Sequence, residues 1–372
     1  MFFITFSTLW SITFFILLTY LTGVVSLLTY LLPLPTANTK YTWSKVFRNS
    51  TLINGFDLLW IVLTPYLLLL LMTNLCVLPS LSAWFGHIII TSFQTKITYV
   101  IIMFFILMTC IFFSTTYFSS REIYDYTITT YNFCYWLIIL FMSNSIFSMV
   151  FVIEVISTLI LLLIVTSAFS TTFFYRNLNL SFGHILQQSL PHSHLQSLLY
   201  FFWVSLISSL NLFLFFLLLY TKILTLDWFL MEYIFFYYVN VSGASDVAAL
   251  GLYWLIMLFC IFVKCGISPL FLWKPTFFKG IPIYTLFFYI CFFYFFLFLF
   301  IIHFLTSYFT EIFYFYTMVT ILFIVLGLVT LLCIICESYY VKVFMAISSI
   351  LNSLFVILAI TANHSTTIFF WL

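Results

Sequence analysis

Residues 130–173 read TYNFCYWLIILFMSNSIFSMVFVIEVISTLILLLIVTSAFSTTF, an almost uninterrupted apolar stretch of 44 residues. An α-helix rises about 1.5 Å per residue, so roughly 20 residues cross the hydrocarbon core of a bilayer. The stretch is too long for one crossing. It therefore predicts two membrane-spanning helices joined by a tight turn near Ser143-Asn144-Ser145, where three small polar side chains favour a turn.

The composition extends this interpretation to the whole chain. Of the 372 residues, 65% are hydrophobic and 5% are charged, whereas about a quarter are charged in soluble domains. We therefore expect an integral membrane protein. Apolar runs of roughly 20 residues favour helices over barrel strands, which alternate over about 10 residues. The 11 basic and 9 acidic residues leave no extended basic face, which argues against nucleic acid as a partner.

Apolar runs separated by charged or Pro- and Asn-rich breaks predict an all-α polytopic bundle of about ten transmembrane helices. Residues 1–129 are expected to hold helices 1–3 and residues 130–372 helices 4–10, in one membrane domain. The predicted spans are 2–32, 57–80, 97–119, 130–149, 150–173, 197–220, 247–270, 283–306, 312–336 and 343–363.

Basic residues in the predicted loops divide unequally between the two sides of the membrane. One side receives Lys40, Lys45, Arg48, Arg121, Arg176, Lys274, Lys279 and Lys342, and the other receives Lys96 and Lys222. Because the basic side usually faces the compartment of synthesis, both termini are predicted to face the opposite side. The excess of Phe (52) and Tyr (25) over Gly (9) and Pro (8) matches AT-rich codons, and no import presequence precedes the first span. An organelle-encoded protein is therefore expected.

Two ionisable residues fall deep within apolar spans, Glu154 and Lys264. A charge in hydrocarbon costs several kcal/mol unless it is paired or hydrated, so such residues usually mark ion or proton pathways. Burial disfavours the charged form of each group and a neighbouring opposite charge favours it, so this pair can exchange protons. A static ion pair that fixes packing is the alternative. Gly266 and Pro269 interrupt the helix beside Lys264, which indicates a hydrated cavity.

Other polar residues have two interpretations each. Ser205, Ser208 and Ser209 share one helix face and either hold water or bond back to their own helix. His303 either relays protons or is satisfied by packing.

The remaining polar groups indicate no bound cofactor in this chain. His192 and His194, like the acids Asp227, Glu232 and Asp246, are expected to be solvated in loops. The eight cysteines are interpreted as small buried hydrophobic residues. Motifs for nucleotides, flavins, metals and iron–sulfur clusters are missing from the sequence.

Three stretches together resemble the antiporter-like subunits of respiratory complex I, and subunit 2 (NADH dehydrogenase subunit 2) more than subunit 4. They are SNSIFSMVFVIE at 143–154, FVKCGISPLFLWKP at 262–275 followed by Gly280-Ile-Pro282, and ESYYVKVFMAISSI at 337–350. Their order and spacing agree over roughly residues 130–355. The resemblance implies that Glu154 and Lys264 form a proton-relay pair and that Lys342 is the loop lysine.

The sequence departs from the family pattern at several positions. The lysine that partners the glutamate falls at Leu199, and the lysine of the eighth helix falls near Tyr294. His303 lies nine residues after Tyr294, on the opposite helix face, and is a poor substitute. The family has fourteen helices, so the remaining ones are expected on a separate chain, or the channel is not completed.

The resemblance implies a proton-translocating membrane-arm subunit of mitochondrial NADH:ubiquinone oxidoreductase, in the inner membrane with both termini toward the intermembrane space. FMN, iron–sulfur clusters and ubiquinone would belong to partner subunits, and lipids and other membrane-arm subunits would surround this chain. Two alternatives stay open at this point: a degenerate scaffold subunit of the same arm, and a stand-alone cation/proton antiporter.

Overall fold

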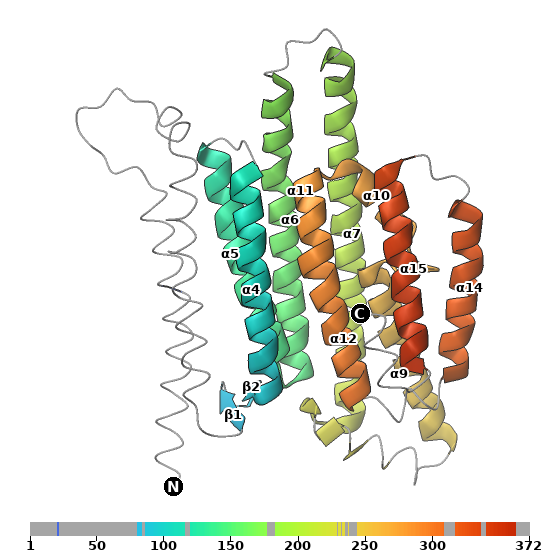
Figure 1. The fold of residues 1–372 in the computed structure, drawn as a ribbon. Coiled ribbons are helices and arrows are strands. Elements are labelled where there is room, and N and C mark those ends of the chain that lie inside the picture. Colours follow the sequence, from blue (N-terminus) through green and yellow to red (C-terminus); the bar gives the residue numbers. More distant parts are fainter. Residues whose placement is uncertain are drawn as a thin grey trace. The chain divides into compact units, whose positions relative to one another are not determined.

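A computed structural model describes Leu21 and residues 80–361, except 84–85, 116–119, 177–182, 229, 232, 235–236, 238–243, 309–316 and 336–339. These residues are mostly helical (Figure 1). The chain forms two units, Met1–Gly183 and His184–Leu372. The boundary expected at 129/130 falls within a single helix of the first unit, and the predicted spans 2–32 and 57–80 lie outside the described residues.

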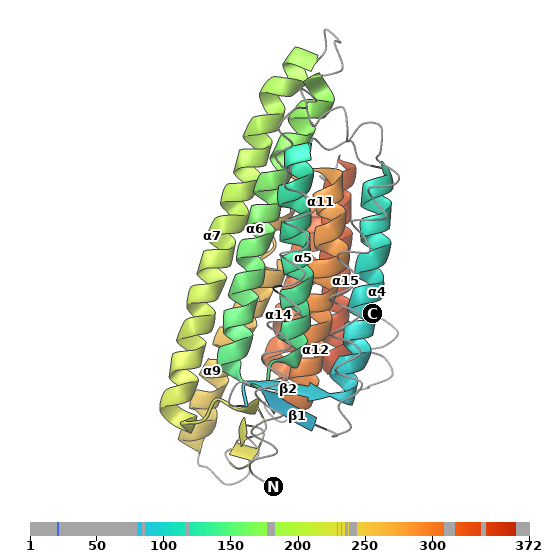
Figure 2. The same ribbon diagram turned by 90° about the vertical axis from the view of Figure 1, so that its left-hand side faces the viewer.

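The described part of the first unit contains a hairpin and three helices. Strand β1 (Ser80–Ala83) pairs antiparallel with β2 (Ile88–Thr91), and the helices are α4 (Ser92–Thr115), α5 (Ser120–Met142) and α6 (Ile146–Arg176). The three helices run side by side (Figures 1 and 2). The sequence predicts a connection between spans from residue 81 to residue 96, and these two strands were not predicted there.

The break predicted near Ser143-Asn144-Ser145 is confirmed, because α5 ends at Met142 and α6 begins at Ile146. The hairpin turn holds this break in place. Asn144 donates from its backbone N–H to His87 O at 2.8 Å and from Nδ2 to Gly86 O at 2.9 Å. His87 Nδ1 lies 2.8 Å from Ser145 Oγ. These hydrogen bonds satisfy polar groups that the chain reversal would otherwise leave unpaired.

Ser145 caps the amino end of α6. Its Oγ accepts the backbone N–H of Ser148 at 3.2 Å, and Ser148 Oγ accepts the backbone N–H of Ser145 at 3.3 Å. This reciprocal pair follows the logic of a capping box, in which two unsatisfied helix donors are paired by side chains. The cap therefore fixes the residue at which α6 begins. It thereby also sets the direction in which the side chains of later residues point.

The second unit contains the remaining helices. They are α7 (Gly183–Ile223), α9 (Ala244–Cys265), α10 (Trp273–Gly280), α11 (Ile283–Phe288), the π-helix η1 (Tyr289–Tyr294), α12 (Phe295–Tyr308), α14 (Thr317–Ile335) and α15 (Val341–Thr361). Segments α11, η1 and α12 follow without interruption and form one rod (Figure 1). Helix α7 begins at Gly183, whereas a loop was predicted over 174–196. The helix was not predicted over this segment because the segment is polar, and only apolar runs indicate a membrane span.

Five of the described helices are long and apolar enough to cross a membrane. They are Ile146–Ser167, Ser193–Ile223, Thr285–His303, Thr317–Ile335 and Val341–Ala359. Shorter apolar helical segments cover Lys96–Met108, Thr129–Met142 and Gly251–Cys265. Each of these eight segments coincides with a predicted span, which agrees with a membrane-embedded helical protein.

Helix α14 shows how an apolar helix divides its faces. Thr320, Ile324, Gly327 and Leu331 are buried and recur every three or four residues. The opposite face is open, with Met318 77% exposed. A Cβ on Gly327 would lie 2.9 Å from Ser268 Cβ, so the glycine allows α14 to approach the turn after α9. Ser268 Oγ completes the contact with Gly327 O and Thr330 Oγ1, both at 2.8 Å.

We predict that Ser145→Ala destabilises the first unit by about 1 kcal/mol, because it removes the cap of α6 and the contact with His87. Thr158→Ala is the matched control, since this exposed hydroxyl donates to Val155 O of its own helix. Thermal unfolding of the full chain in detergent measures both effects. Equal losses of stability in the two variants would contradict the capping role.

Candidate functional site

Lys264 lies at the carboxyl end of α9, in its last turn, and the residue is only 7% exposed. The last carbonyl groups of a helix lack intrahelical partners and carry about half a negative charge. A lysine in this turn therefore lies where the negative end of the helix favours a positive charge.

Helix α9 ends at Cys265, one residue after Lys264, as the sequence predicted from Gly266 and Pro269. Gly266 has φ +61°, and its N–H donates to Val263 O at 3.3 Å, while Ile267 N–H donates to Phe262 O at 2.9 Å. This pair of hydrogen bonds is a Schellman motif, which requires a left-handed residue at the position of Gly266. The motif ends α9 inside the protein rather than at its surface.

Gly266 also makes room for the segment that follows. A Cβ built on it would lie 3.0 Å from Lys274 Cδ and 3.1 Å from Trp273 Cζ2. The chain thus folds back so that the start of α10 covers the end of α9. Trp273 and Lys274 are both buried there.

The sequence predicts Lys274 in a loop between spans, and this prediction is wrong, because the residue lies in the short helix α10. None of its surface is exposed. Its Nζ donates to Cys265 O at 3.3 Å, one of the last carbonyls of α9. The short helix α10 places Lys274 against this helix end, so the lysine is buried although it lies four residues beyond the predicted span 247–270. The flanking Leu272, Trp273, Phe277 and Phe278 were the available signal.

The ring of Tyr294 faces this ammonium. Lys274 Nζ lies 3.7 Å from the centroid of the Tyr294 ring and 5.9 Å from that of Phe278. A ring face attracts a cation, more strongly when both are shielded from water. Tyr294 ends the π-helix η1, and its OH donates to Ser349 O of α15 at 3.2 Å. π-helical turns often occur at functional sites because they change which residues face inward.

Burial lowers the pKa of the Lys274 ammonium from 10.5 to about 7, and the neighbouring Cys265 opposes part of this shift. Lys274 lies in α10, outside the candidate membrane spans on either side. Its pKa places it where both the charged and the neutral forms are populated near neutral pH. Such a group can bind and release a proton.

A second set of polar contacts surrounds the residues that follow α10. Lys342, half-buried at the start of α15, donates from Nζ to Ile281 O at 2.7 Å. His194 Nδ1 lies 3.1 Å from Gly280 O. Because a carbonyl oxygen only accepts, His194 is protonated at Nδ1. These contacts tether α15 and α7 to the end of α10.

The expectation that His194 is a solvated loop residue is therefore wrong, since it lies in α7 and is half-buried. Gly280 explains the close approach: a Cβ there would overlap Ser193 O. The side chain of His192 lies outside the described residues. Asp227 is exposed, as predicted for a solvated acid.

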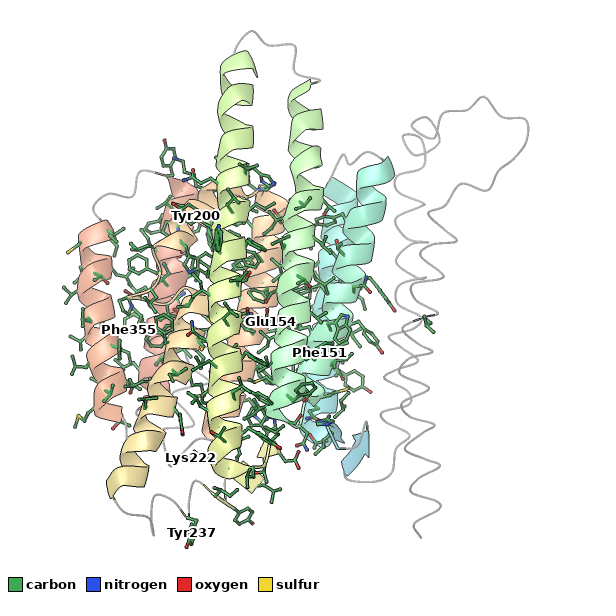
Figure 3. All side chains as sticks on the ribbon, turned by 180° about the vertical axis from the view of Figure 1, so that it is seen from behind. Phe151, Glu154, Tyr200, Lys222, Tyr237 and Phe355 are labelled. Atoms are coloured by element: carbon green, nitrogen blue, oxygen red, sulfur yellow. The ribbon has the colours of Figure 1, made fainter. Side chains whose placement is uncertain are left out.

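Glu154 belongs to the first unit and lies two turns into α6, in the part nearer the capped end (Figure 3). Its side chain is half-buried. Because Ser145 fixes the start of α6, the rotation that presents Glu154 is set by the hairpin turn. Glu154 and Lys264 belong to different units of the chain.

The three serines of α7 bond back to their own helix, which is one of the two predicted alternatives. Ser205, Ser208 and Ser209 donate to Phe202 O, Ser205 O and Leu206 O, each at 2.8 Å. Their donors are used in this way, so only acceptor positions are left for water. Leu199, on the same helix, is 47% exposed.

His303 is half-buried in α12. Its role as a relay stays a prediction. Among the described residues, no three His, Cys, Asp or Glu side chains are grouped so as to hold a metal ion.

Comparison with protein-family models and with curated proteins finds no match to this chain. What the structure defines is a class, a mostly helical protein with helices able to cross a membrane. Within it, the second unit contains two buried lysines, Lys264 and Lys274, at the carboxyl end of α9.

We predict that Gly266→Ala destabilises the protein more than Gly86→Ala does. Both glycines have positive φ, +61° and +92°, which costs other residues about 1–2 kcal/mol. Only at Gly266 does the added Cβ meet neighbours within 4 Å. Thermal unfolding of the two variants in detergent separates backbone strain from crowding, and equal destabilisation would contradict the close approach of Lys274 and Trp273.

We predict that Lys274→Met stabilises the protein at acidic and neutral pH. The unfolded chain keeps the ordinary lysine pKa, so between about pH 7 and pH 10.5 it binds more protons than the folded chain, and wild-type stability rises with pH. Below about pH 7 the full penalty of the buried cation is present. The advantage of the variant should therefore shrink by roughly 3 kcal/mol between about pH 6 and pH 9.5.

Unfolding midpoints of wild type and variant across this pH range measure the effect. Lys279→Met is the matched control, because Lys279 is exposed in the same short helix. A difference between wild type and Lys274→Met that does not vary with pH would show that Lys274 keeps one charge state.

Proposed function

We propose that this chain is a proton-translocating membrane-arm subunit of mitochondrial NADH:ubiquinone oxidoreductase, similar to subunit 2 and with an antiporter-like bundle of about ten helices. It would lie in the inner membrane as a multi-pass protein, with both termini toward the intermembrane space. FMN, iron–sulfur clusters and ubiquinone would be bound by partner subunits. The three stretches at 143–154, 262–275 and 337–350 support this proposal.

The observation that carries the proposal is the surroundings of Lys264. The lysine is buried at the end of a helix that stops within the protein and continues through a Schellman turn. The resemblance implies a functional lysine at this position, and Gly266 and Pro269 predict the break in the helix beside it. Irregular backbone at membrane depth is tolerated where it is covered by protein or lines a hydrated space.

The proposed mechanism depends on the charge states of Glu154 and Lys264. When quinone is reduced in a partner subunit, a charge change along the membrane arm alters the field at Glu154. A carboxylate that becomes negative favours the protonated form of an amine, and a carboxyl group that becomes neutral allows the amine to release its proton. Lys264 would thus take up and release one proton per cycle, with its ammonium stabilised by the negative end of α9.

A scaffold role in the same membrane arm is the second candidate, and specific observations favour it. Lys342 is bound to a backbone carbonyl, and leucine and tyrosine occupy positions 199 and 294, where the family has lysines. A subunit that only joins its neighbours would need Lys264 for packing alone. A stand-alone cation/proton antiporter would instead be active without redox partners.

We predict that Lys264→Met abolishes NADH-driven proton translocation by the complex that contains this chain, while assembly survives. Methionine has a similar length but binds no proton. Acidification of sealed membrane vesicles measures translocation, and native gel electrophoresis measures assembly. Lys222→Met is the matched control, because Lys222 is exposed at the end of α7 (Figure 3). Unchanged pumping in Lys264→Met would favour the scaffold, and proton exchange by the isolated chain would favour the antiporter.

A further inference from the structure

Lys274 is a buried amine with fewer partners than an ammonium ion can use. An ammonium group has three N–H donors. Among the described residues, Lys274 Nζ has one hydrogen-bond acceptor, Cys265 O at 3.3 Å, and one close ring face, that of Tyr294 at 3.7 Å. Two partners also suit the two N–H donors of a neutral amine. The contacts of Lys274 therefore accommodate both the charged and the neutral form.

The described helices around Lys274 bring no carboxylate to it. Helices α7, α10, η1 and α15 contain no Asp or Glu, and the acid of α9, Asp246, lies at the opposite end of that helix. A buried cation that no carboxylate balances gives up its proton more readily. These helices do place other titratable groups at α10 or at the adjacent end of α9, namely Lys264, Cys265, Tyr289, Tyr294, His194, Lys342 and Lys279.

Two buried polar atoms near Lys274, Trp273 Nε1 and Tyr289 OH, have no hydrogen-bond partner in the described part of the chain. Trp273 Cε2, which is bonded to Nε1, would lie 3.2 Å from a Cβ on Gly266, and Lys274 Cδ would lie 3.0 Å from it. The Tyr289 ring packs on Phe278, whose centroid is 5.9 Å from Lys274 Nζ. Because buried polar groups are almost always satisfied, by protein or by ordered water, these two donors indicate that water reaches this part of the unit.

The ring of Tyr294 distinguishes the two forms of the amine. A ring face attracts a cation, more strongly where both are shielded from water, and this charge-dependent attraction is lost when the amine is neutral. Tyr294 is 9% exposed at the end of η1, and its OH donates to Ser349 O of α15 at 3.2 Å. This hydrogen bond fixes the ring, so the ring favours the ammonium form of Lys274 and opposes the effect of burial.

We propose that Lys274 is a proton-carrying residue of the second unit and that Tyr294 is its positioning residue, whose ring holds the ammonium form and releases the neutral amine. The place of Lys274 in transport rests on the proposed function, whereas its exchange of a proton with water does not. The resemblance assigns roles to Lys264 and Lys342 but not to Lys274. Burial lowers the pKa of Lys274 to about 7, which agrees with a group that changes its charge near neutral pH.

The exchange conserves charge and atoms. One N–H bond of the Lys274 ammonium breaks, its electron pair stays on Nζ, and an O–H bond forms on a water molecule. The water molecule passes its extra proton on, and the reverse transfer restores the ammonium ion. No oxidant or reductant takes part.

A titration of the lysine side chains tests the proton exchange. The full chain is labelled with ¹⁵N at lysine Nζ and reconstituted in lipid, where the ¹⁵N shift distinguishes an ammonium ion from an amine. Lys274→Arg identifies the Lys274 signal by its loss. We expect this signal to change from ammonium to amine near pH 7. A signal that remains that of an ammonium ion through about pH 9 would overturn the proposal.

Two variants test the positioning role of Tyr294. Tyr294→Phe keeps the ring face and loses the hydrogen bond to Ser349 O, whereas Tyr294→Leu loses both. The Lys274 pKa should fall by about one unit in Tyr294→Leu, because the ammonium form loses the ring, and by much less in Tyr294→Phe. A role in packing alone would lower the unfolding temperature without moving this titration. An unchanged Lys274 pKa in Tyr294→Leu, or equal shifts in the two variants, would contradict the role of the ring.

Transport by the assembled complex tests whether Lys274 carries protons. Lys274→Met and Lys274→Arg should both lower NADH-driven proton translocation at least about tenfold, because methionine binds no proton and arginine does not release its own. Lys279→Met changes an exposed lysine of the same helix and should leave translocation unchanged. Normal translocation in Lys274→Arg would overturn the transport role and leave the proposed function standing. If Lys264→Met pumps normally, the proposed function fails, and the titration still decides whether Lys274 exchanges a proton.

Discussion

A helix that ends inside a protein leaves its last carbonyl groups without intrahelical partners. The second unit is organised around the hydrogen bonds that the last carbonyl groups of α9 accept. The Schellman turn pairs two of them with backbone donors. Cys265 O instead accepts from Lys274, which brings the aromatic residues of α10 with it. The Gly266 conformation, the burial of Lys274 and the position of Trp273 are consequences of this one helix end.

The same constraint links the surrounding helices. Phe277 of α10 packs on Tyr289 of η1 with ring centroids 5.0 Å apart, and Tyr294 joins η1 to α15 through Ser349 O. Lys342 and His194 add hydrogen bonds to the carbonyls that follow α10. Among the described residues of the second unit, several polar contacts between helices lie along the segment from α9 to α11. A change in the charge of Lys274 would therefore act on contacts shared by several helices.

The candidate site was only partly predictable. Glu154 and Lys264 stand out in sequence because charges within long apolar runs are rare. Lys274 does not, because it lies outside the apolar run, and a lysine in a connection between spans is usually solvated. The residues that bury it, Gly266 and Tyr294, are distant in sequence or have no charge to mark them. The back-bonding of the α7 serines also required coordinates, since both alternatives suit the same spacing.

Hydrophobic run length by itself determined that this is a membrane-embedded helical protein, and it placed the break at Ser143–Ser145, because the bilayer thickness fixes how many apolar residues one helix needs. Tertiary structure decided what run length does not encode: the hairpin that holds that break, the extension of α7 to Gly183, and the burial of Lys274. These features depend on backbone hydrogen bonds and packing between segments far apart in the chain, where the local pattern of apolar residues carries no information.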